Sequence, residues 1–494
     1  MKHIALIIAA ALILSWTAAA TAAEVSDATD NCLSCHSTAT PGIVADWKRS
    51  RHFKTSVAEA LKQDPGNRRV SADKVPDALA NVSVGCAECH TLNQDKHPGS
   101  FDHEGVRVHS VVSPNDCAVC HPTEADQFKL NKMSHAWGIL TQNPLYQDLM
   151  VVINGTAAIE NGQIKRTEPD PETTNDSCLQ CHGTKVEVSK IEVRETDFGD
   201  FQIPVLSGWP NQGVGRVNPD GSKGACTACH TRHQFSIAMA RKPYTCSQCH
   251  KGPDVPAYKV YQVSKHGNLH ESLNSEWDFN AVPWVVGRDF SAPTCAVCHA
   301  SLLQDTEGNT VAQRTHQFND RLPWRLLGLP YAHHQPKDPD TTQIRNKSGL
   351  PLPTDLSGEP ASDYLIDDAE VQLRTKTMKN VCLACHTTYW TDNHWNRLLN
   401  TINTTNAMTL AATNVMQSAW TKGVATGPPD GSLFDESLER RWVEQWLFFA
   451  NTTRLASAML GADYGAFDNG RWDMSRNLQD MTEWLNMKIQ NQKK

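Results

Sequence analysis

The sequence predicts a mostly α-helical protein with loop-rich N-terminal and central regions and a C-terminal bundle of long helices. Hydrophobic residues make up only 39% of the 494 positions, which is lean for a chain of this length. Apolar residues recur at helical spacing mainly beyond residue 374, whereas Pro, Gly, Asn and Asp interrupt the earlier segments. All 16 cysteines belong to one repeated motif. We therefore expect the N-terminal and central regions to be organised around something other than an aliphatic core.

The repeated motif is Cys-x-x-Cys-His, which occurs eight times. The copies are Cys32-Cys35-His36, Cys86-Cys89-His90, Cys117-Cys120-His121, Cys178-Cys181-His182, Cys226-Cys229-His230, Cys246-Cys249-His250, Cys295-Cys298-His299 and Cys382-Cys385-His386. This spacing is the attachment signal of c-type haem, in which two thiols bind the porphyrin and the next imidazole reaches the iron. The sequence therefore predicts a multihaem cytochrome c with eight covalently bound haems, and porphyrins supply the apolar surface that the chain lacks.

Other uses of paired cysteines fit the pattern less well. Disulfide bonds do not require a His after every second Cys. Structural zinc needs four ligands, and only the motifs at Cys226 and Cys246 are close enough to share them. Thioredoxin-type redox chemistry needs one such motif rather than eight. Haem attachment accounts for all the copies together.

Residues 1–23 are typical of a secretory signal peptide. An apolar run extends from Ile4 to Leu14, and small residues end at Ala23, after which we expect cleavage. The run is shorter than the roughly 20 residues that a membrane span requires, and no later stretch qualifies. We expect the mature protein in the periplasm, where haem is attached to c-type cytochromes, without a stable membrane span.

The charge balance argues against nucleic acid as a partner. Lys and Arg total 46 against 54 Asp and Glu, which gives a net charge of −8. Haem propionates add negative charge, and no long basic run is present. Small redox-active substrates and other redox proteins remain as expected partners.

Motif positions and composition divide the chain into four parts. These are the signal peptide (1–23), a haem region with motifs 1–4 (24–200), a haem region with motifs 5–7 (201–373), and a domain with haem 8 and long helices (374–494). Stretches rich in Pro, Asp and Thr at 167–176 and 336–360 are predicted to be surface loops or domain boundaries. Residues 151–153 and 186–193 are predicted to form brief hairpin strands.

Three long helices are predicted in the C-terminal domain from the spacing of apolar residues. They contain residues 398–416, 438–459 and 474–485. Asp435 is expected to cap the second helix, and Gly461 is expected to end it. We expect these helices to cover haem 8 and to associate subunits through their Trp-rich faces.

Iron ligation decides what each haem can do. A haem with two His ligands passes electrons, whereas one with an open sixth position can bind a substrate. The eight motif histidines are the predicted proximal ligands, and enough others remain to close every iron, so counting does not establish a catalytic site. The predicted distal ligands are His52, His109, His135, His233, His266, His316 and His394.

Residues 226–316 carry the most distinctive local sequences. These are Cys226-Thr-Ala-Cys-His-Thr-Arg-His233, then Tyr261-Gln-Val-Ser-Lys-His266-Gly, and Cys295-Ala-Val-Cys-His followed by Thr315-His316. They resemble the octahaem hydroxylamine oxidoreductase family, and the similarity extends over essentially the whole mature chain. The resemblance implies a mostly helical subunit that trimerises through C-terminal helices. It also implies that the haem of motif 4 is the open, catalytic one and that His233, His266 and His316 are distal ligands of other haems.

The chain departs from the hydroxylamine-oxidising members of that family around the predicted catalytic haem. Those members have an Asp-His pair where this chain has Asp254-Val255, so the second imidazole is missing unless His270 replaces it. Arg325 stands where they have a Tyr, with Tyr331 as a possible substitute. We predict that Asp254, Arg325 and Tyr331 form a catalytic pocket that binds an anion and donates protons.

A second departure concerns the Tyr that, in the oxidising members, cross-links the catalytic haem of a neighbouring subunit. Trp472 stands at that position, and Tyr464 lies nearby out of register. A haem without this cross-link suits donation of electrons to a nitrogen oxide.

Three functions are therefore considered for this chain. The favoured one is reduction of nitrite or NO to hydroxylamine or ammonium at haem 4, and the others are hydroxylamine oxidation and electron transfer by a non-catalytic subunit. The expected partners are a small nitrogen-oxide or hydroxylamine substrate and a redox partner cytochrome or quinol-linked complex. We expect a homotrimer or a hetero-oligomer with a related chain.

Overall fold

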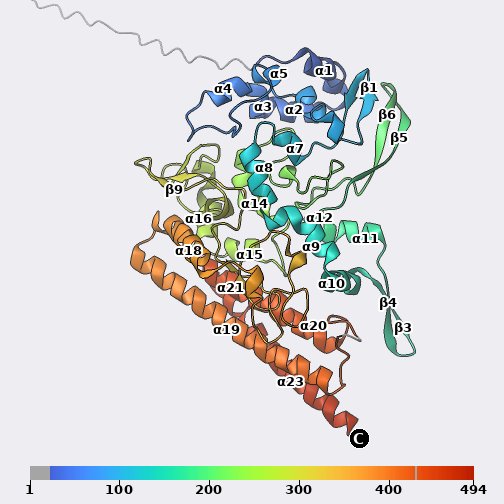
Figure 1. The fold of residues 1–494 in the computed structure, drawn as a ribbon. Helices are drawn as coiled ribbons and strands as arrows, with labels where there is room; N and C mark the ends of the chain where they lie inside the picture. Colours follow the sequence, from blue (N-terminus) through green and yellow to red (C-terminus); the bar gives the residue numbers. More distant parts are fainter. Residues whose placement is uncertain (1–22, 429–430, 494) are drawn as a thin grey trace, which may run out of the picture.

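The computed structural model describes residues 23–428 and 431–493, and Figure 1 shows their elongated arrangement. The N-terminal helices lie at one end of the molecule and the long C-terminal helices at the other. Residues 1–22, which contain nearly all of the predicted signal peptide, lie outside the described residues. The described chain is mostly helical and rich in loops, as predicted.

Short helices carry or follow the motifs of the first 200 residues. They are α1 (Asp27–Ala39), α2 (Pro41–Arg49), α3 (Arg51–Lys54), α4 (Val57–Leu61), α5 (Asp77–Ala80), α6 (Cys86–His90), α7 (Pro114–Cys117), α8 (Pro122–Lys129), α9 (Ala136–Gln142), α10 (Pro144–Asn154), α11 (Pro171–Asp176) and α12 (Cys178–His182). Both α6 and α12 coincide with a motif. Helical geometry places the two cysteines and the His at i, i+3 and i+4 on one face, as attachment to one porphyrin requires.

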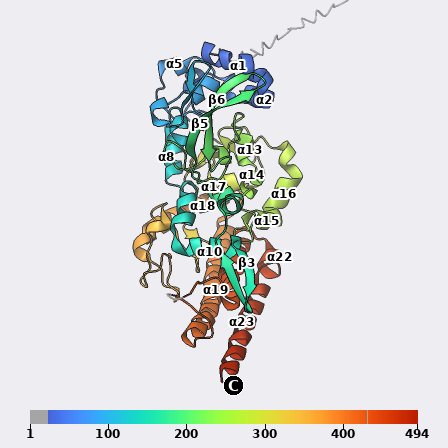
Figure 2. The same ribbon diagram turned by 90° about the vertical axis from the view of Figure 1, so that its right-hand side faces the viewer.

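Three antiparallel hairpins belong to the same part of the chain. They are β1 (Phe101–His103) with β2 (Val106–Val108), β3 (Thr156–Glu160) with β4 (Gln163–Thr167), and β5 (Glu187–Thr196) with β6 (Gly199–Ser207). Figure 2 shows β5 and β6 beside the N-terminal helices, with the β3–β4 hairpin near the C-terminal helices. The strand predicted at 186–193 corresponds to β5.

Two local predictions in this region are wrong. Residues 151–153 belong to α10, because Pro144 and the cap at Asn143 start a helix whose Leu145, Leu149 and Val152 pack against the C-terminal core. The predicted loop at 167–176 contains α11, which Asp170 caps by accepting from the Thr173 amide at 2.9 Å.

The central region consists of short helices and very short strands. The helices are α13 (Ile237–Arg241), α14 (Pro243–Ser247), α15 (Ala257–Gln262), α16 (Lys265–Leu273) and α17 (Cys295–His299). The strands β7 (Trp284–Val285), β8 (Leu303–Gln304) and β9 (Thr310–Ala312) form one sheet, and β10 (Trp324–Arg325) pairs with β11 (His333–His334). A compact aromatic cluster that includes Trp284 and Phe290 packs beside the sheet.

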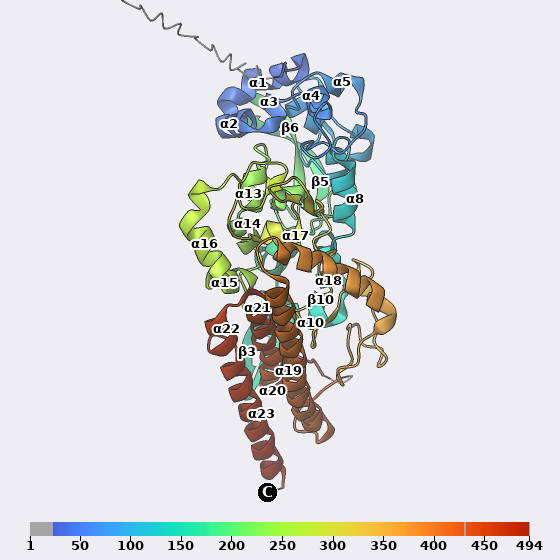
Figure 3. The ribbon, with the colours of Figure 1, turned by 90° about the vertical axis from the view of Figure 1, so that its left-hand side faces the viewer.

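The C-terminal domain contains the long helices that the sequence predicts. Its helices are α18 (Asp368–Leu383), α19 (Thr388–Thr421), α20 (Ser437–Val443), a π-helical segment (Glu444–Ala450), α21 (Asn451–Met459), α22 (Ala462–Ala466) and α23 (Arg471–Gln492). The first predicted helix is α19, the second is formed by α20, the π-helical segment and α21 together, and the third is α23. Figure 3 shows α19 and α23 side by side. Met416, Leu438, Trp442 and Met481 fill the space between the helices. Among the described residues, no helix combines the length and apolar character that crossing a membrane requires.

The ends of the second long helix differ by one residue from prediction. Glu436, rather than Asp435, is the N-cap of α20, and its amide donates to the Glu439 carboxylate at 3.0 Å. At the other end, Leu460 adopts a left-handed conformation with φ of 59° and ends α21 before Gly461.

Candidate haem sites and the surroundings of motif 4

Several motif histidines are oriented so that one ring nitrogen remains free for a metal. Their Nδ1 atoms lie at hydrogen-bond distance from protein oxygens, as ligating histidines commonly do. The pairs are His36 with Thr40 Oγ1 at 3.0 Å, His90 with the His109 carbonyl at 2.8 Å, His182 with the Ala136 carbonyl at 3.3 Å and His299 with the Phe318 carbonyl at 3.0 Å. Each Nε2 is thereby left for iron.

Five motif histidines also lie opposite a second imidazole. The ring centroids are 6.1 Å apart for His36 and His103, 6.3 Å for His121 and His52, 6.2 Å for His90 and His109, 6.4 Å for His230 and His316, and 6.2 Å for His386 and His266. Two imidazoles bound to one metal at about 2 Å each hold their centroids roughly 6 Å apart. The residues therefore fit six-coordinate c-type haems at four of these pairs.

The pair of His90 and His109 does not fit this arrangement. The His109 carbonyl accepts the hydrogen bond from His90 Nδ1, which places the backbone of His109 on the proximal side of that haem. Its ring stacks on His97 and faces Asp116 instead. The structure therefore contradicts a distal role for His109 at haem 2. Burial lowers the pKa of His90, and the charges of His109 and His233 lower it further, so His233 also lies near this motif.

The other predicted distal ligands divide into two groups. His52, His266 and His316 lie opposite motif histidines, in pairs contributed by distant segments. His135 and His394 do not lie opposite a motif histidine at this spacing: His135 Nε2 is 2.9 Å from the Lys129 carbonyl, and His394 stacks on Trp390. Sequence reasoning missed His103, which is on β1 and has no motif-like context.

Cysteine side chains of different motifs lie close together and define what we call the motif path. Four pairs of thiols lie close enough for one to shift the pKa of the other: Cys32 with Cys86, Cys117 with Cys226, Cys181 with Cys249, and Cys246 with Cys295. Burial raises the pKa of Cys229 and of Cys298, and Cys246 and Cys382, respectively, raise these values further. Cys89 also raises the pKa of Cys117, after Cys226 and burial, so these three pairs are near as well. The motif path runs 1-2-3-5-6-7-8, with motif 4 joined to motif 6.

Motif 4 differs from the two other ends of the motif path. His36 of motif 1 and His386 of motif 8 each face a second imidazole. In the described part of the chain, no imidazole faces His182 at that spacing. Burial lowers the pKa of His182, while the Ala136 carbonyl and the charge of Asp254 raise it. Among the three ends, motif 4 thus combines an unpaired motif histidine with a nearby carboxylate. Away from the ends, His250 and His299 also lack a facing imidazole at that spacing among the described residues, and Asp254 also raises the pKa of His250.

The structure brings together the two loops that carry the predicted catalytic residues. Asn451 on α21 donates from Nδ2 to the Asp254 carbonyl at 3.5 Å and accepts from the Gly328 amide at 2.9 Å. Arg454, one turn later, donates to the Leu326 carbonyl at 3.1 Å. The loop after motif 6 and the β10–β11 loop are therefore held against the same helix.

The side chains of these loops have different surroundings. Tyr331 is buried and donates to the Leu356 carbonyl at 2.7 Å, and burial raises its pKa to about 12. Its proton is thus already engaged, and the predicted catalytic role of Tyr331 has no geometric support. Arg325 lies opposite His333 in the β10–β11 register. Burial, followed by Arg325, holds the pKa of His333 far below its usual range.

His333 is a candidate that sequence reasoning missed. Its Nε2 is buried without a hydrogen-bond partner, and Lys132 also lies near enough to lower its pKa. Arg325 and Lys132 therefore place positive charge beside His333, and this charge favours the binding of an anion there. The ring of His270 packs among Tyr261, Trp277 and Phe279 instead, so it is not placed as a substitute for the missing imidazole.

Comparison with known families matches two parts of the chain. Residues 217–323 match the family described as "Seven times multi-haem cytochrome CxxCH". Residues 20–113 and 116–200 match the family described as "Cytochrome c554 and c-prime". Both descriptions agree with covalently bound c-type haem.

Individual proteins extend this similarity over most of the chain. A solved "Hypothetical multiheme protein" is 38% identical, covers 95% of this chain and 97% of its own, and superposes with a TM-score of 0.89. A chain of the reducing HAO-like protein complex of Kuenenia stuttgartiensis shares the fold, with 17% identity, coverage of 94% and 85%, and a TM-score of 0.60. A curated relative from the same organism, a "Probable nitrite reductase-hydroxylamine oxidoreductase fusion protein", is 27% identical over 383 residues, which are 72% of this chain. The match spans about a third of that relative's length, 34%.

Proposed function

Because the chain belongs to the multihaem c-type cytochromes of the hydroxylamine oxidoreductase type, we propose that it reduces nitrite or NO to hydroxylamine or ammonium at haem 4. We also propose that the chain carries eight c-type haems, one for each motif. The observation that carries the proposal is the contrast among the three ends of the motif path. Motifs 1 and 8 have facing imidazoles, whereas His182 of motif 4 has a carboxylate nearby instead.

The residues around motif 4 suit a reaction that consumes protons together with electrons. The haems supply iron that gains and loses electrons. The Ala136 carbonyl fixes the orientation of the His182 ring. In this proposal Asp254, whose charge acts on His182, supplies protons, and the positive charge of Arg325 beside His333 attracts an anion such as nitrite. We propose that electrons reach haem 4 from haem 6, because Cys249 of motif 6 lies close enough to Cys181 to lower its pKa.

The residue at the cross-linking position favours reduction over oxidation. Trp472 is 59% exposed and cannot form the phenol-to-haem bond expected of the oxidising members. Tyr464 lies on α22. A denaturing gel stained for haem provides the check: we expect a single-chain band, and a band near three times that mass would indicate a cross-link.

The C-terminal surface supports association of subunits. Leu460, Phe467 and Trp472 are exposed and line an apolar groove of about 610 Å³ on α21, α22 and the start of α23. Exposed aromatic groups of this kind commonly mark protein interfaces. We propose a homotrimer, or a hetero-oligomer with a related chain, in the periplasm, and a cytochrome or quinol-linked complex as the electron donor.

Steady-state turnover tests the proposed reaction. The holoprotein, reduced by an artificial viologen donor, should consume nitrite and release hydroxylamine or ammonium. Asp254→Asn should slow turnover by about 10²-fold or more if the carboxylate handles protons, with unchanged haem content. Asp220→Asn, distant from motif 4 in the sequence, is the matched control. Oxidation of hydroxylamine without nitrite reduction would instead identify the protein as a hydroxylamine dehydrogenase. If neither activity is found, electron transfer remains as its function.

A further inference from the structure

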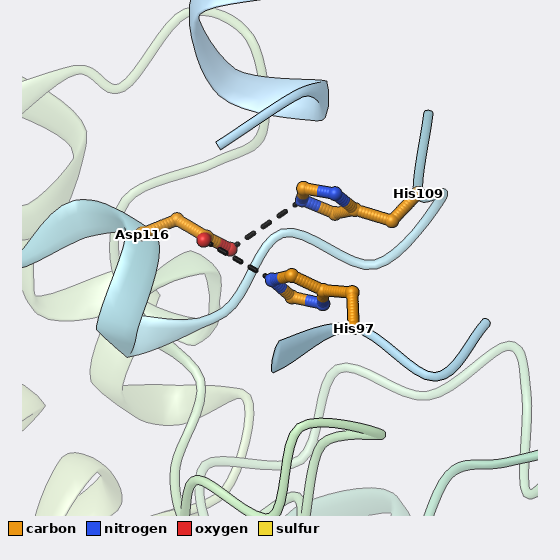
Figure 4. A group of neighbouring side chains, drawn as sticks. All are labelled: His97, His109 and Asp116. Carbon is orange, nitrogen blue, oxygen red and sulfur yellow. Dashed lines mark hydrogen bonds and ion pairs between the residues drawn. The ribbon is translucent and has the colours of Figure 1, made fainter. Parts of the chain in front are cut away.

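A buried cluster of His97, His109 and Asp116 lies outside the haem-ligand pairs. His97 follows the 3-10 helix Gln94–Lys96, His109 follows β2, and Asp116 belongs to α7. The three residues are 2%, 2% and 3% exposed. Figure 4 shows both imidazoles directed towards the carboxylate, one ring above the other. Three separate segments therefore bring two nitrogen donors and one oxygen donor to the same point.

The spacing of the donor atoms suits one metal ion. His97 Nε2 is 3.1 Å from Asp116 Oδ1, and His109 Nε2 is 3.5 Å from Asp116 Oδ2. Two ligand atoms that are each about 2.1 Å from a tetrahedral ion stand roughly 3.4 Å apart. The two rings are nearly parallel, with centroids 3.7 Å apart, so both rings must turn out of this stack to direct their lone pairs to the ion.

The hydrogen bonding of the cluster leaves a ligand position unsatisfied. Both ring nitrogens of His109 are buried and have no hydrogen-bond partner. The carbonyl of the same residue is bound to His90, so its ring cannot reach the opposite face of that haem. Native interiors rarely leave such nitrogens unpaired, and a bound ion or water is the usual reason where they do.

The charge of the cluster also calls for a cation. The Asp116 carboxylate accepts from the Ser113 amide at 2.8 Å and from Asn93 at 2.9 Å, which holds it as an anion. Among the described residues its ion-pair partners are the two imidazoles alone. A divalent ion between the carboxylate and the two rings would be bound by one anionic and two imidazole donors.

A small cavity beside the rings provides space for a fourth ligand. It has a volume of about 10 Å³ and is lined by both histidines together with Gly99 and Val111. This is roughly the space that one water molecule needs. Two imidazoles, one carboxylate and one water form a donor set that suits Zn²⁺ and related divalent ions.

We propose that His97, His109 and Asp116 bind one divalent transition-metal ion of the Zn²⁺ type, separate from the haem irons. The ion joins the loops that flank haems 2 and 3, because His109 orients His90 and Asp116 immediately precedes Cys117. Its role is structural, and it does not depend on which nitrogen compound the protein reduces.

Metal analysis of the holoprotein tests this site. The protein is incubated with Zn²⁺, dialysed extensively and analysed for zinc against haem iron. We expect one zinc per chain, and we expect His97→Gln and Asp116→Asn to lower retention about ten-fold or more. Asp220→Asn is the matched control, because Asp220 accepts from Ser113 and Asn115 in the same region without facing an imidazole. Absence of zinc from the wild-type protein, or its retention in both ligand variants, would overturn the proposal.

X-ray absorption at the zinc edge gives a second readout that needs no variant. Haem iron does not interfere at this edge. The expected first shell contains nitrogen and oxygen at about 2.0–2.1 Å with scattering from two imidazoles. Sulfur in the first shell, or a shell of oxygen alone, would contradict the assignment.

Discussion

The C-terminal helices and the haem regions differ in what fills their interiors. In the helices, Met416, Leu438, Trp442 and Met481 are at most 1% exposed, and the Trp442 indole donates to Thr413 at 2.9 Å. All 16 cysteines, 14 of which lie in the haem regions, are exposed or half-buried. Side chains fill the interior of the helical region. In the haem regions, side chains instead surround the haem groups that the motifs attach.

The buried histidines lead to the same conclusion. Ring nitrogens without partners occur at His103, His109, His135, His270, His316, His333 and His394. Such atoms are costly in a protein interior unless a ligand or water satisfies them. The contrast teaches that folding and haem attachment are one process over most of this chain, while the long helices depend mainly on their own packing.

The largest expected effect comes from withholding haem. If the chain is exported without haem attachment, residues 24–373 should lose nearly all protection from amide hydrogen exchange. The long helices α19, α20–α21 and α23 should keep substantial protection, because their apolar cluster is made of side chains. Uniform loss of protection along the chain would show that the two regions do not differ in this way.

Truncating the centre of the helical core should have the next largest effect. Trp442→Ala should destabilise the C-terminal domain by about 3–5 kcal/mol, since it removes a buried indole and leaves a cavity. Denaturant unfolding followed by hydrogen exchange of α19 and α23 measures it. Trp472→Ala, at a 59% exposed position, should change stability by less than about 0.5 kcal/mol in the monomer.

The stability of the helical domain should also depend on pH through Glu439. Burial, and to a lesser extent Asp435, raises its pKa to about 7 from its ordinary value of 4.5. The folded state therefore favours the protonated acid, so its contribution is fully present below pH 4.5 and is lost as the pH rises through 7. The loss amounts to roughly 3 kcal/mol at 1.36 kcal/mol per pKa unit. Glu439→Gln should flatten this pH dependence, and an unchanged slope in that variant would assign it to another group.

The smallest effect is expected in the β3–β4 hairpin, whose Ile159 and Ile164 are paired across the strands and exposed. Ile159→Thr should leave the stability within about 0.5 kcal/mol of the wild type and the haem spectrum unchanged. Thermal unfolding monitored at the haem absorption band provides the measurement. A larger loss would mean that this hairpin is covered by another chain in the assembled protein.

How far the sequence predicted the structure differs between the two regions. Apolar spacing located the long helices because their core residues recur periodically in the sequence. The spacing did not distinguish Glu436 from its neighbour Asp435 as the N-cap of α20. Residues 151–153 were predicted as a strand because periodicity does not report contact with a distant helix. The packing of α10 against the C-terminal core decides the outcome.

The haem-attachment motifs were readable because their chemistry is local. Facing imidazoles are not local: motif 3 pairs with His52, motif 5 with His316 and motif 8 with His266. The same limit explains the omission of His103 and the mistaken role of His109. Chain topology, rather than residue type, decides which His lies opposite which motif.

Binding of carbon monoxide to the fully reduced protein tests most directly whether haem 4 is open. The unpaired His182 predicts that at least one CO binds per chain in the wild-type protein. His103→Gly should raise the number by one by opening haem 1, whereas His97→Gln should leave it unchanged. Absence of CO binding in the wild-type protein would contradict an open haem 4 and would make the chain an electron-transfer subunit.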